Sequence, residues 1–412
     1  MREHNKLLTL LPLFLVLVID TMGAGIVFPI MSPLFMSPNE SILALDTSEV
    51  MRKFWYGITL TSWSALMFFG APYLGDLSDR IGRKKVLIVC LIVDSLGFVL
   101  SAIGIQWHLL SLLIIGRLVS GFFSGSQPIA QAVIADVSTK ENKVHNMSMI
   151  IFATCIGYII GPVMGGYVAD ANIVSWFEFS TPFYLAGIMA LLNALLLVFT
   201  LKETFVPKLN IKPKLVKGLI IFFDAFKDKK LRLLSIVLFA LESAWSIFFV
   251  YEPVYLFMTY HYNNVEIAHY MSYMGVIFAV ALTLGLRVSH YYLSLERIVK
   301  LFMISMIVAL IMMIFFTSEV SFWFLSIPVG IAGSVAYSVL LTIYSNSVSA
   351  DRQGWVMGIS GAISAAAFGV SAALTPLMSA ISPELPFIVA AIVAGICVAG
   401  MIIHKQRHHL VT

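Results

Sequence analysis

Four ionisable side chains lie inside long apolar runs of this chain, and their types suggest the chemistry they could do. Asp20, Asp94 and Glu242 are acids, and Arg117 is a base. A carboxyl group in low-dielectric surroundings is costly when charged, which suits a group that takes up and releases protons. An arginine inside a membrane span costs about 2.5–3.5 kcal/mol on insertion scales and normally faces the protein interior with a partner. We therefore predict that the acids exchange protons and that Arg117 biases their pKa, with Asp20 and Arg117 as a pair.

Structural alternatives exist for two of these residues. Arg117 could be locked to backbone carbonyl groups, and Asp94 could be a structural acid bonded to a neighbouring hydroxyl group. Another acid, Glu252, is expected near an interface with water, where a carboxylate is cheap.

The composition excludes a water-soluble fold. The chain has 412 residues, of which 59% are hydrophobic and 12% charged, whereas soluble domains carry about 25% charged residues. Cys90, Cys155 and Cys397 lie far apart inside apolar runs, which predicts small buried side chains rather than a disulfide framework or a metal site. The sequence has no nucleotide-binding loop, zinc-ligand spacing or nucleophile triad. We expect neither an enzyme, nor a cofactor, nor a nucleic-acid partner.

The apolar runs predict an all-α membrane protein with twelve transmembrane helices, since a spanning helix needs about 20 mostly apolar residues. The first run resembles a signal peptide in outline, but it is too long for one, so we expect a retained helix. The predicted spans are 7–35, 54–75, 84–105, 108–136, 144–169, 180–201, 232–258, 263–286, 295–317, 320–346, 353–381 and 384–404.

These spans divide the chain into two halves of six helices, residues 1–201 and 232–412. The linker between them, 202–231, is rich in lysine, and its segment 215–226 mixes charged residues with isoleucine and phenylalanine. That segment fits either a helix on the membrane surface or a simple tether.

Basic residues gather on one predicted side of the membrane. The connections on the other side hold only Arg52 and Lys53. The positive-inside rule then places both termini in the cytoplasm.

A short charged connection, residues 75–85, joins the second and third spans. Asp79 and Arg80 lie side by side in it as an acid/base pair, and glycines permit turns and close approach. It could be an ordinary basic loop. It resembles, however, the signature loop of the major facilitator superfamily, G-x-L-a-D-r-x-G-r-k, through Gly75, Leu77, Asp79, Arg80, Gly82, Arg83 and Lys84. The resemblance implies a gate, in which Asp79 approaches the start of helix 11, near 354–358, and the loop's arginine pairs with Asp136.

Two further motifs narrow the resemblance. Arg117 and Gly121 match the superfamily's helix-4 motif R-x-x-x-G, which is associated with proton transfer. The fifth span matches g-x-x-x-G-P-x-x-G-G of the drug/proton antiporter branch through Gly157, Gly161, Pro162, Gly165 and Gly166. Glycines at i, i+4 and i+8 also make a flat face for helix packing, which is the alternative reading. The acids of helices 1 and 3 resemble those of the tetracycline/proton antiporters.

Several residues are expected to line a central cavity, although packing and interface anchoring are alternatives for the aromatic ones. They are Trp63, Phe122, Gln127, Tyr158, Trp245, Tyr273 and Tyr337.

The combined prediction is a monomeric, proton-coupled secondary transporter of the inner or plasma membrane. It would export a small amphipathic molecule or drug in exchange for protons by alternating access, with substrate, protons and the lipid bilayer as partners. A proton-coupled importer of a metabolite or siderophore is the first alternative, because fold does not fix function. A receptor or assembly factor is the second, but it would gain nothing from the insertion cost of Asp20 and Arg117.

Overall fold

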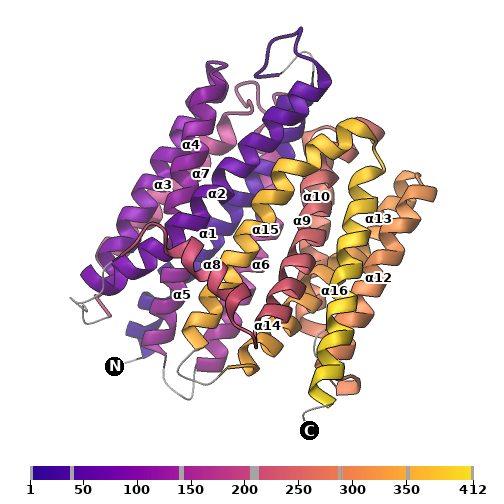
Figure 1. Cartoon of the computed structure of the whole chain (residues 1–412). Helices are drawn as coiled ribbons and strands as arrows, with labels where there is room; N and C mark the ends of the chain where they lie inside the picture. The colour runs from indigo at the N-terminus through magenta and orange to yellow at the C-terminus, as the bar shows by residue number, and fades with distance from the viewer. Residues whose placement is uncertain are drawn as a thin grey trace. The chain divides into compact units, whose positions relative to one another are not determined.

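The computed structural model describes residues 3–37, 41–138, 143–204, 213–285, 289, 291–348 and 353–409, which form helices and short connections without any strand. Figure 1 shows the order of these helices along the chain. In the first part of the chain they are α1 (Glu3–Met36), α2 (Glu49–Ile81), α3 (Arg83–Gln106), α4 (Leu110–Phe123), α5 (Ser126–Val137), α6 (Lys143–Val168) and α7 (Thr181–Thr200).

The second part of the chain begins with a short helix inside the predicted linker. Its elements are α8 (Lys217–Lys227), α9 (Arg232–Tyr260), α10 (Asn264–Val280), the π-helical turn η1 (Ala281–Gly285), α12 (Leu295–Phe315), α13 (Glu319–Ile331), the π-helical turn η2 (Ala332–Ala336), α14 (Tyr337–Asn346), α15 (Gln353–Ile381) and α16 (Leu385–His409).

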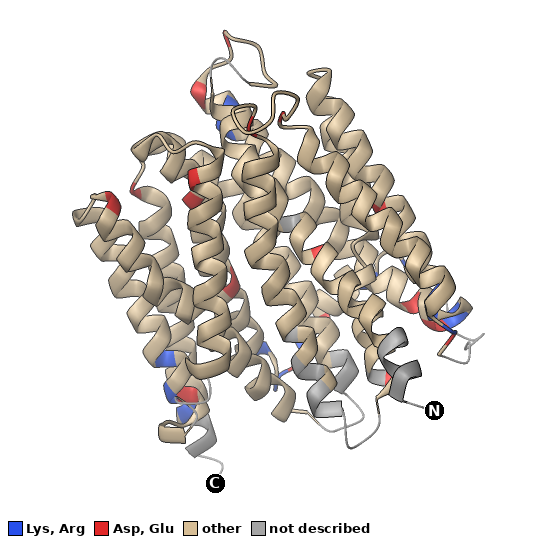
Figure 2. Cartoon of the chain, turned by 180° about the vertical axis from the view of Figure 1, so that it is seen from behind, with Lys and Arg blue, Asp and Glu red and all other residues tan. Residues whose placement is uncertain are grey.

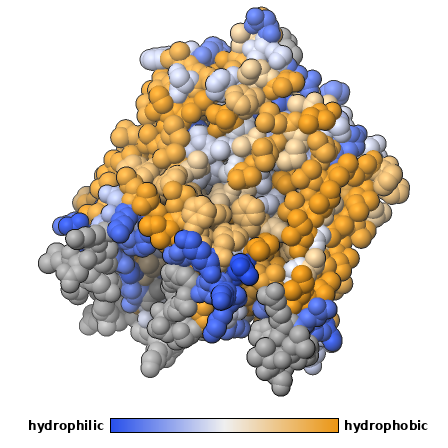
Figure 3. All heavy atoms as spheres, viewed as in Figure 1, coloured by the Kyte–Doolittle hydropathy of each residue, from blue (hydrophilic) through white to orange (hydrophobic). Residues whose placement is uncertain are grey.

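Ten helical segments of the described chain are long and apolar enough to cross a membrane. Basic and acidic residues gather near helix ends, and the lengths of the helices carry few of them (Figure 2). Apolar residues cover the sides of the helices on the face shown in Figure 3. The predicted spans 54–75 and 144–169 coincide with α2 and α6, of which α6 has a shorter apolar part, Phe152–Val168. A multi-pass helical membrane protein is therefore confirmed, and the number twelve stays a prediction.

Contacts divide the chain into two compact units. One comprises Met1–Ser48, Ser62–Gly218 and Tyr262–Gly275, and the other Glu49–Thr61, Leu219–His261 and Val276–Thr412. The start of α2 thus packs with the second unit, where Lys53 Nζ donates to the Ser379 carbonyl over 3.0 Å and Tyr56 Oη to the Val250 carbonyl over 3.0 Å.

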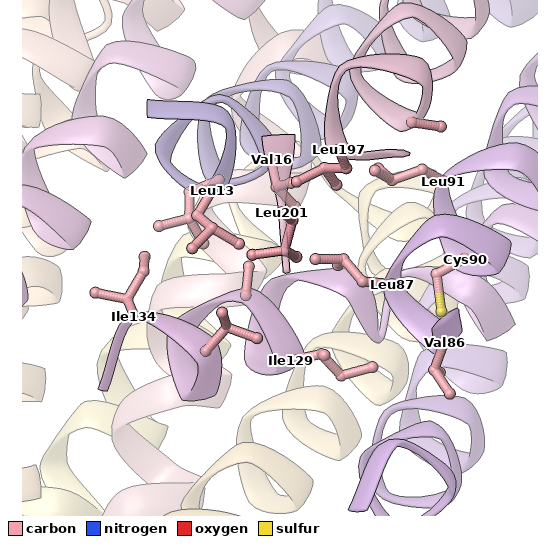
Figure 4. Close-up of a cluster of buried hydrophobic side chains, with 14 of the residues drawn as sticks. Leu13, Val16, Val86, Leu87, Cys90, Leu91, Ile129, Ile134, Leu197 and Leu201 are labelled. Carbon is pink, nitrogen blue, oxygen red and sulfur yellow. The ribbon is translucent and has the colours of Figure 1, made fainter. Parts of the chain in front are cut away.

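The first unit has an apolar core to which α1, α2, α3, α5, α6 and α7 contribute. Leu13 and Val16 of α1, Leu87 of α3, Ile134 of α5 and Leu197 of α7 are all fully buried in it, and Figure 4 shows their side chains converging. This core holds α1, α3 and α5 in the positions from which their polar residues meet.

The second unit is built around aromatic side chains. The rings of Tyr255 and Phe322 stack with centroids 5.0 Å apart, and Phe387 packs edge-on against Tyr255 at 5.2 Å. Glu252 lies fully buried one turn before Tyr255, so its carboxyl group does not reach water at the protein surface. Its position near the outer end of the span stays a prediction.

Candidate functional site

The glycine face of α6 brings α1 close and so positions Asp20. A Cβ on Gly157 would come within 2.7 Å of the Val18 carbonyl oxygen, and one on Gly161 within 2.7 Å of the Met22 oxygen. These α1 contacts flank Asp20 on both sides. Helices can approach this closely only where small residues remove the side chains between them.

Two other residues of that motif also make contacts. Pro162 Cδ lies 2.9 Å from the position of a Cβ on Gly25 of α1. Gly166 faces α10 instead, where Asn264 Nδ2 donates to its carbonyl over 2.7 Å. The motif is therefore a packing surface in this structure, and it serves the helix that carries Asp20.

The fourth predicted span is interrupted in its middle, which the sequence does not predict. α4 ends at Phe123 and α5 begins at Ser126. At the start of α5 the Ser126 hydroxyl group donates to Oδ2 of Asp20 over 2.7 Å. Interrupted helices are a common way to bring backbone and side-chain dipoles to an ion or substrate site inside a membrane.

A small cavity of the first unit brings the predicted charged residues together. It is lined by Asp20, Gly23, Trp63, Asp94, Phe98, Arg117 and Ser124. Its free space is about 20 Å³, room for a water molecule or one small group. Four of these lining residues are candidate site residues from the sequence, namely Asp20, Asp94, Arg117 and Trp63. The structure places all four at the wall of one cavity.

Arg117 lies at the wall of this cavity, almost completely buried. Its Cζ atom is 5.7 Å from the centre of the Trp63 ring, a cation–π distance. Among the described residues its Nε has no hydrogen-bond partner, and no ion pair within 4.0 Å joins Arg117 to Asp20. The expected direct pair is therefore not formed: Asp20 has Ser126 as its partner, and Asp94 is the acid that interacts electrostatically with Arg117.

Glu242 belongs to the second unit, with Ser364 of α15 beside it. Three residues further along α9, the Trp245 ring packs against Phe278 at 4.9 Å and lies over Gly333 of the π-helical turn η2. π-Helical turns are frequent at functional sites. Glu242 and Trp245 are three positions apart and therefore share one face of α9. That they line a central cavity stays a prediction.

The other predicted wall residues are dispersed. Phe122 packs against Tyr73 and belongs to the border of the apolar core. Gln127 is half-buried at the start of α5, and Tyr337 is half-buried at the start of α14. Tyr158 is 38% exposed on α6, and Tyr273 lies near Tyr270 on α10, with ring centres 6.2 Å apart.

The signature connection is much shorter than predicted, because α2 continues to Ile81 and α3 begins at Arg83. Gly82 alone forms the turn, with a φ of 108° that L-residues other than glycine rarely adopt. Gly75 lies inside α2, and a Cβ added to it would meet no described heavy atom within 4 Å, so it makes no close approach in this structure.

An arginine of the connection pairs with Asp136, as the resemblance implies, but the partner of Asp79 is not the predicted Arg80. Arg83 Nη1 lies 2.6 Å from Oδ2 of Asp136, and Arg83 Nη2 lies 3.4 Å from Oδ1 of Asp79. Arg80 is exposed. The partner of both acids is therefore Arg83 and not Arg80, and the approach of Asp79 to residues 354–358 stays a prediction.

Glu203 is a member of this charged cluster that sequence reasoning missed. Its carboxylate accepts the backbone N–H groups of Arg83 and Lys84 at 3.0 and 3.2 Å. It caps the N-terminus of α3, where the helix dipole favours a negative charge. Burial raises the pKa of the Asp136 carboxyl group above its ordinary value, Arg83 lowers it, and Asp79 and Glu203 raise it further.

Comparison with known families decides the class of the protein. The model of the Major Facilitator Superfamily matches residues 13–372. The chain belongs to this superfamily. Membership of this superfamily makes it a membrane transporter and not an enzyme.

Relatives in the superfamily include drug resistance proteins. Tetracycline resistance protein, class B, of Escherichia coli is 30% identical over 186 residues, which are 45% of this chain and 42% of that protein, so the match spans less than half of the relative. Quinolone resistance protein NorA of Staphylococcus aureus (strain MRSA252) is 22% identical over 394 residues, 93% of this chain and 92% of that protein.

Solved structures share the fold. The human organic anion transporter MFSD10 (TETRAN) aligns with a TM-score of 0.71 and 18% identity over 98% of this chain and 99% of that one. The D-xylose-proton symporter aligns with a TM-score of 0.71 and 16% identity over 95% and 96% of the two chains.

Proposed function

We propose that the protein exports a small amphipathic drug-like molecule in exchange for protons. The observation that carries the proposal is the cavity of the first unit, in which two acids, Asp20 and Asp94, share the wall with one arginine. The tetracycline and quinolone resistance relatives support export of a drug.

The charge balance of the cavity supplies a physical reason for exchange. With both acids ionised, Asp20, Asp94 and Arg117 carry a net charge of −1, and with one acid protonated the net charge is zero. The ionised cavity favours a cationic group of a substrate, and the protonated cavity does not. Proton and substrate therefore exclude one another, which is the condition for antiport.

Ser126 links the protonation of Asp20 to the position of α5, the second part of the fourth span. Its hydroxyl group stabilises the ionised Asp20 by a charge-assisted hydrogen bond. Protonation of Asp20 weakens that bond and frees the start of α5 to move relative to α1. Glu242, in the second unit, is proposed as a second proton-exchanging acid.

The rest of the predicted organisation belongs to the same proposal. Residues 1–201 and 232–412 form two six-helix halves that alternate access to a midplane cavity, with 202–231 as a cytoplasmic linker. The charged cluster of Asp79, Arg83 and Asp136 acts as a gate. Both termini face the cytoplasm, and the transporter works as a monomer in the inner membrane.

Flux in proteoliposomes under an imposed pH gradient tests the function, with a tetracycline and a quinolone as substrates. We expect pH-driven accumulation by the wild type and its loss in Asp20→Asn, which imitates the protonated acid. The wild type should also release protons when substrate is added to the detergent-solubilised protein, and Asp20→Asn should not. Import down the proton gradient would identify the importer instead, and equal proton release by both proteins would make Asp20 structural.

A further inference from the structure

The helix α8 carries an apolar face that the described part of the molecule leaves uncovered. Leu219, Ile220 and Phe223 are 37%, 45% and 54% exposed, and they lie on one side of the helix. Leu215 and Val216, which directly precede the helix, are more than half exposed as well. Five exposed apolar residues in nine positions are far more than a solvated linker needs.

The opposite face of α8 is packed against the protein. Gly218 is buried beneath the Phe68 carbonyl group of α2. Ala225 is fully buried, and its carbonyl accepts the Ser235 hydroxyl group of α9 over 3.1 Å. Lys217 also forms an ion pair with Asp76 of α2. The helix is therefore fixed in one rotation, with its apolar side turned away from the protein.

The connection to α9 fixes where this apolar side lies along the membrane. Only residues 228–231 separate α8 from α9, an apolar spanning segment. The N–H groups of Leu231 and Arg232 both bond to the Asp228 carbonyl, at 3.2 and 2.8 Å, so the connection is a tight turn. α8 must then lie at the membrane boundary.

Exposed lysines surround the apolar face. Lys214 precedes α8, Lys227 ends it, and Lys229 and Lys230 follow it. The nearby acids are Asp224 and Asp228, so the net charge of the segment is positive. An apolar helical face bordered by lysines is the pattern that binds an anionic lipid surface.

We propose that α8 is a docking surface for anionic phospholipids. Leu219, Ile220 and Phe223 enter the boundary between headgroups and acyl chains, and Lys227, Lys229 and Lys230 bind lipid phosphate groups. Asp224 lies at the polar edge of the helix and faces water, whereas Lys217 stays paired with Asp76 of α2. This surface is separate from the cavity of Asp20 and does not depend on which substrate is carried.

Spin labels at neighbouring positions test the docking. In a protein with Cys90, Cys155 and Cys397 replaced by serine, one label is attached at Phe223→Cys and the matched control at Asp224→Cys. Nanodiscs contain phosphatidylcholine alone or with phosphatidylglycerol. With phosphatidylglycerol, we expect the label at 223 to collide several times more with oxygen than with a water-soluble nickel chelate, and the label at 224 to show no such excess.

Two single substitutions of lysine test whether the positive charge at α8 binds anionic lipid. Lys229→Gln should lower the apparent affinity for phosphatidylglycerol, measured by native mass spectrometry, about fivefold. Lys85→Gln, which removes an exposed lysine from α3, should leave the lipid retained at α8 unchanged.

Three results would overturn the proposal. Equal nickel access at 223 and 224 would place the apolar face in water. Protection of 223 from both reagents would mean that a protein, such as a second copy, covers it. If the label at 223 showed the same accessibility to oxygen and to the nickel chelate in both nanodisc compositions, α8 would not be selective for anionic lipid.

Discussion

The hydroxyl group of Ser126 donates to Oδ2 of Asp20 over 2.7 Å, and this bond joins the start of α5 to α1. Ser126 is the first residue of α5, directly after the break in the fourth span. Asp20 lies on the part of α1 that packs on the α6 glycines. This one hydrogen bond therefore links the position of α5 to the protonation state of Asp20.

Ser126→Ala should slow pH-driven transport about tenfold, because a hydrogen bond to a charged acceptor is worth about 1.5–3 kcal/mol. Thr154→Ala is the matched control, since among the described residues the Thr154 hydroxyl group bonds to the Ile150 carbonyl of its own helix. Initial rates in proteoliposomes at equal protein density provide the measurement. Equal rates for the two variants would show that the Ser126 bond has no part in transport.

Gly161→Ala should destabilise the protein by about 1–3 kcal/mol, because the new Cβ would clash with the Met22 backbone and the two helices would have to separate. Gly361→Ala is the control: no described heavy atom lies within 4 Å of its Cβ position, and alanine is the better helix former. Thermal unfolding in detergent compares them. A similar change in melting temperature for both would contradict the packing role of the α6 glycines.

The sequence alone predicts the apolar helices and identifies the acids of the cavity, because both predictions depend only on residue type. Long apolar runs require helices in a membrane, and Asp20, Asp94 and Arg117 are conspicuous inside them. The break at residues 124–125 is not predictable, because Gly121 and Gly125 in an apolar run fit helix packing equally well.

Long-range contacts are also beyond the sequence. Glu203 caps α3 from 120 residues away, and no local pattern indicates it. The sequence favours Arg80 over Arg83 only if the connection is a loop. Since α2 in fact continues to Ile81 and Gly82 turns the chain into α3, Arg83 at the start of α3 comes within 3.4 Å of Asp79.

Arg83→Gln should cost about 1 kcal/mol of stability, because it removes the cation that pairs with the partly exposed Asp136. Arg80→Gln should change stability by less than about 0.5 kcal/mol, as expected for an exposed side chain. Chemical or thermal unfolding of the two variants distinguishes the residues. A larger loss in Arg80→Gln would restore the sequence-based assignment.

Asp136 should make stability depend on pH in a direction opposite to that of an ordinary ion-paired acid. Burial raises the pKa of its carboxyl group in the folded protein, so the folded state binds the proton more tightly than the unfolded chain. This contribution is fully present below about pH 4 and is lost as the pH rises through the raised pKa. The wild type should therefore lose more stability than Asp136→Asn between about pH 4 and neutrality. Parallel melting curves across this range would contradict the raised pKa.

Cysteine labelling tests the predicted orientation, in which both termini face the cytoplasm. The reason is the concentration of lysine and arginine in the connections predicted to be cytoplasmic, against Arg52 and Lys53 on the other side. In the cysteine-free protein, a membrane-impermeant maleimide added to intact cells should label Ser41→Cys, which follows α1, and should not label Ser138→Cys, which follows α5. After detergent both positions should react, which confirms that Ser138→Cys is reachable once the membrane is open. The reverse pattern in intact cells would invert the topology, and with it the side on which the Arg83 cluster and α8 lie.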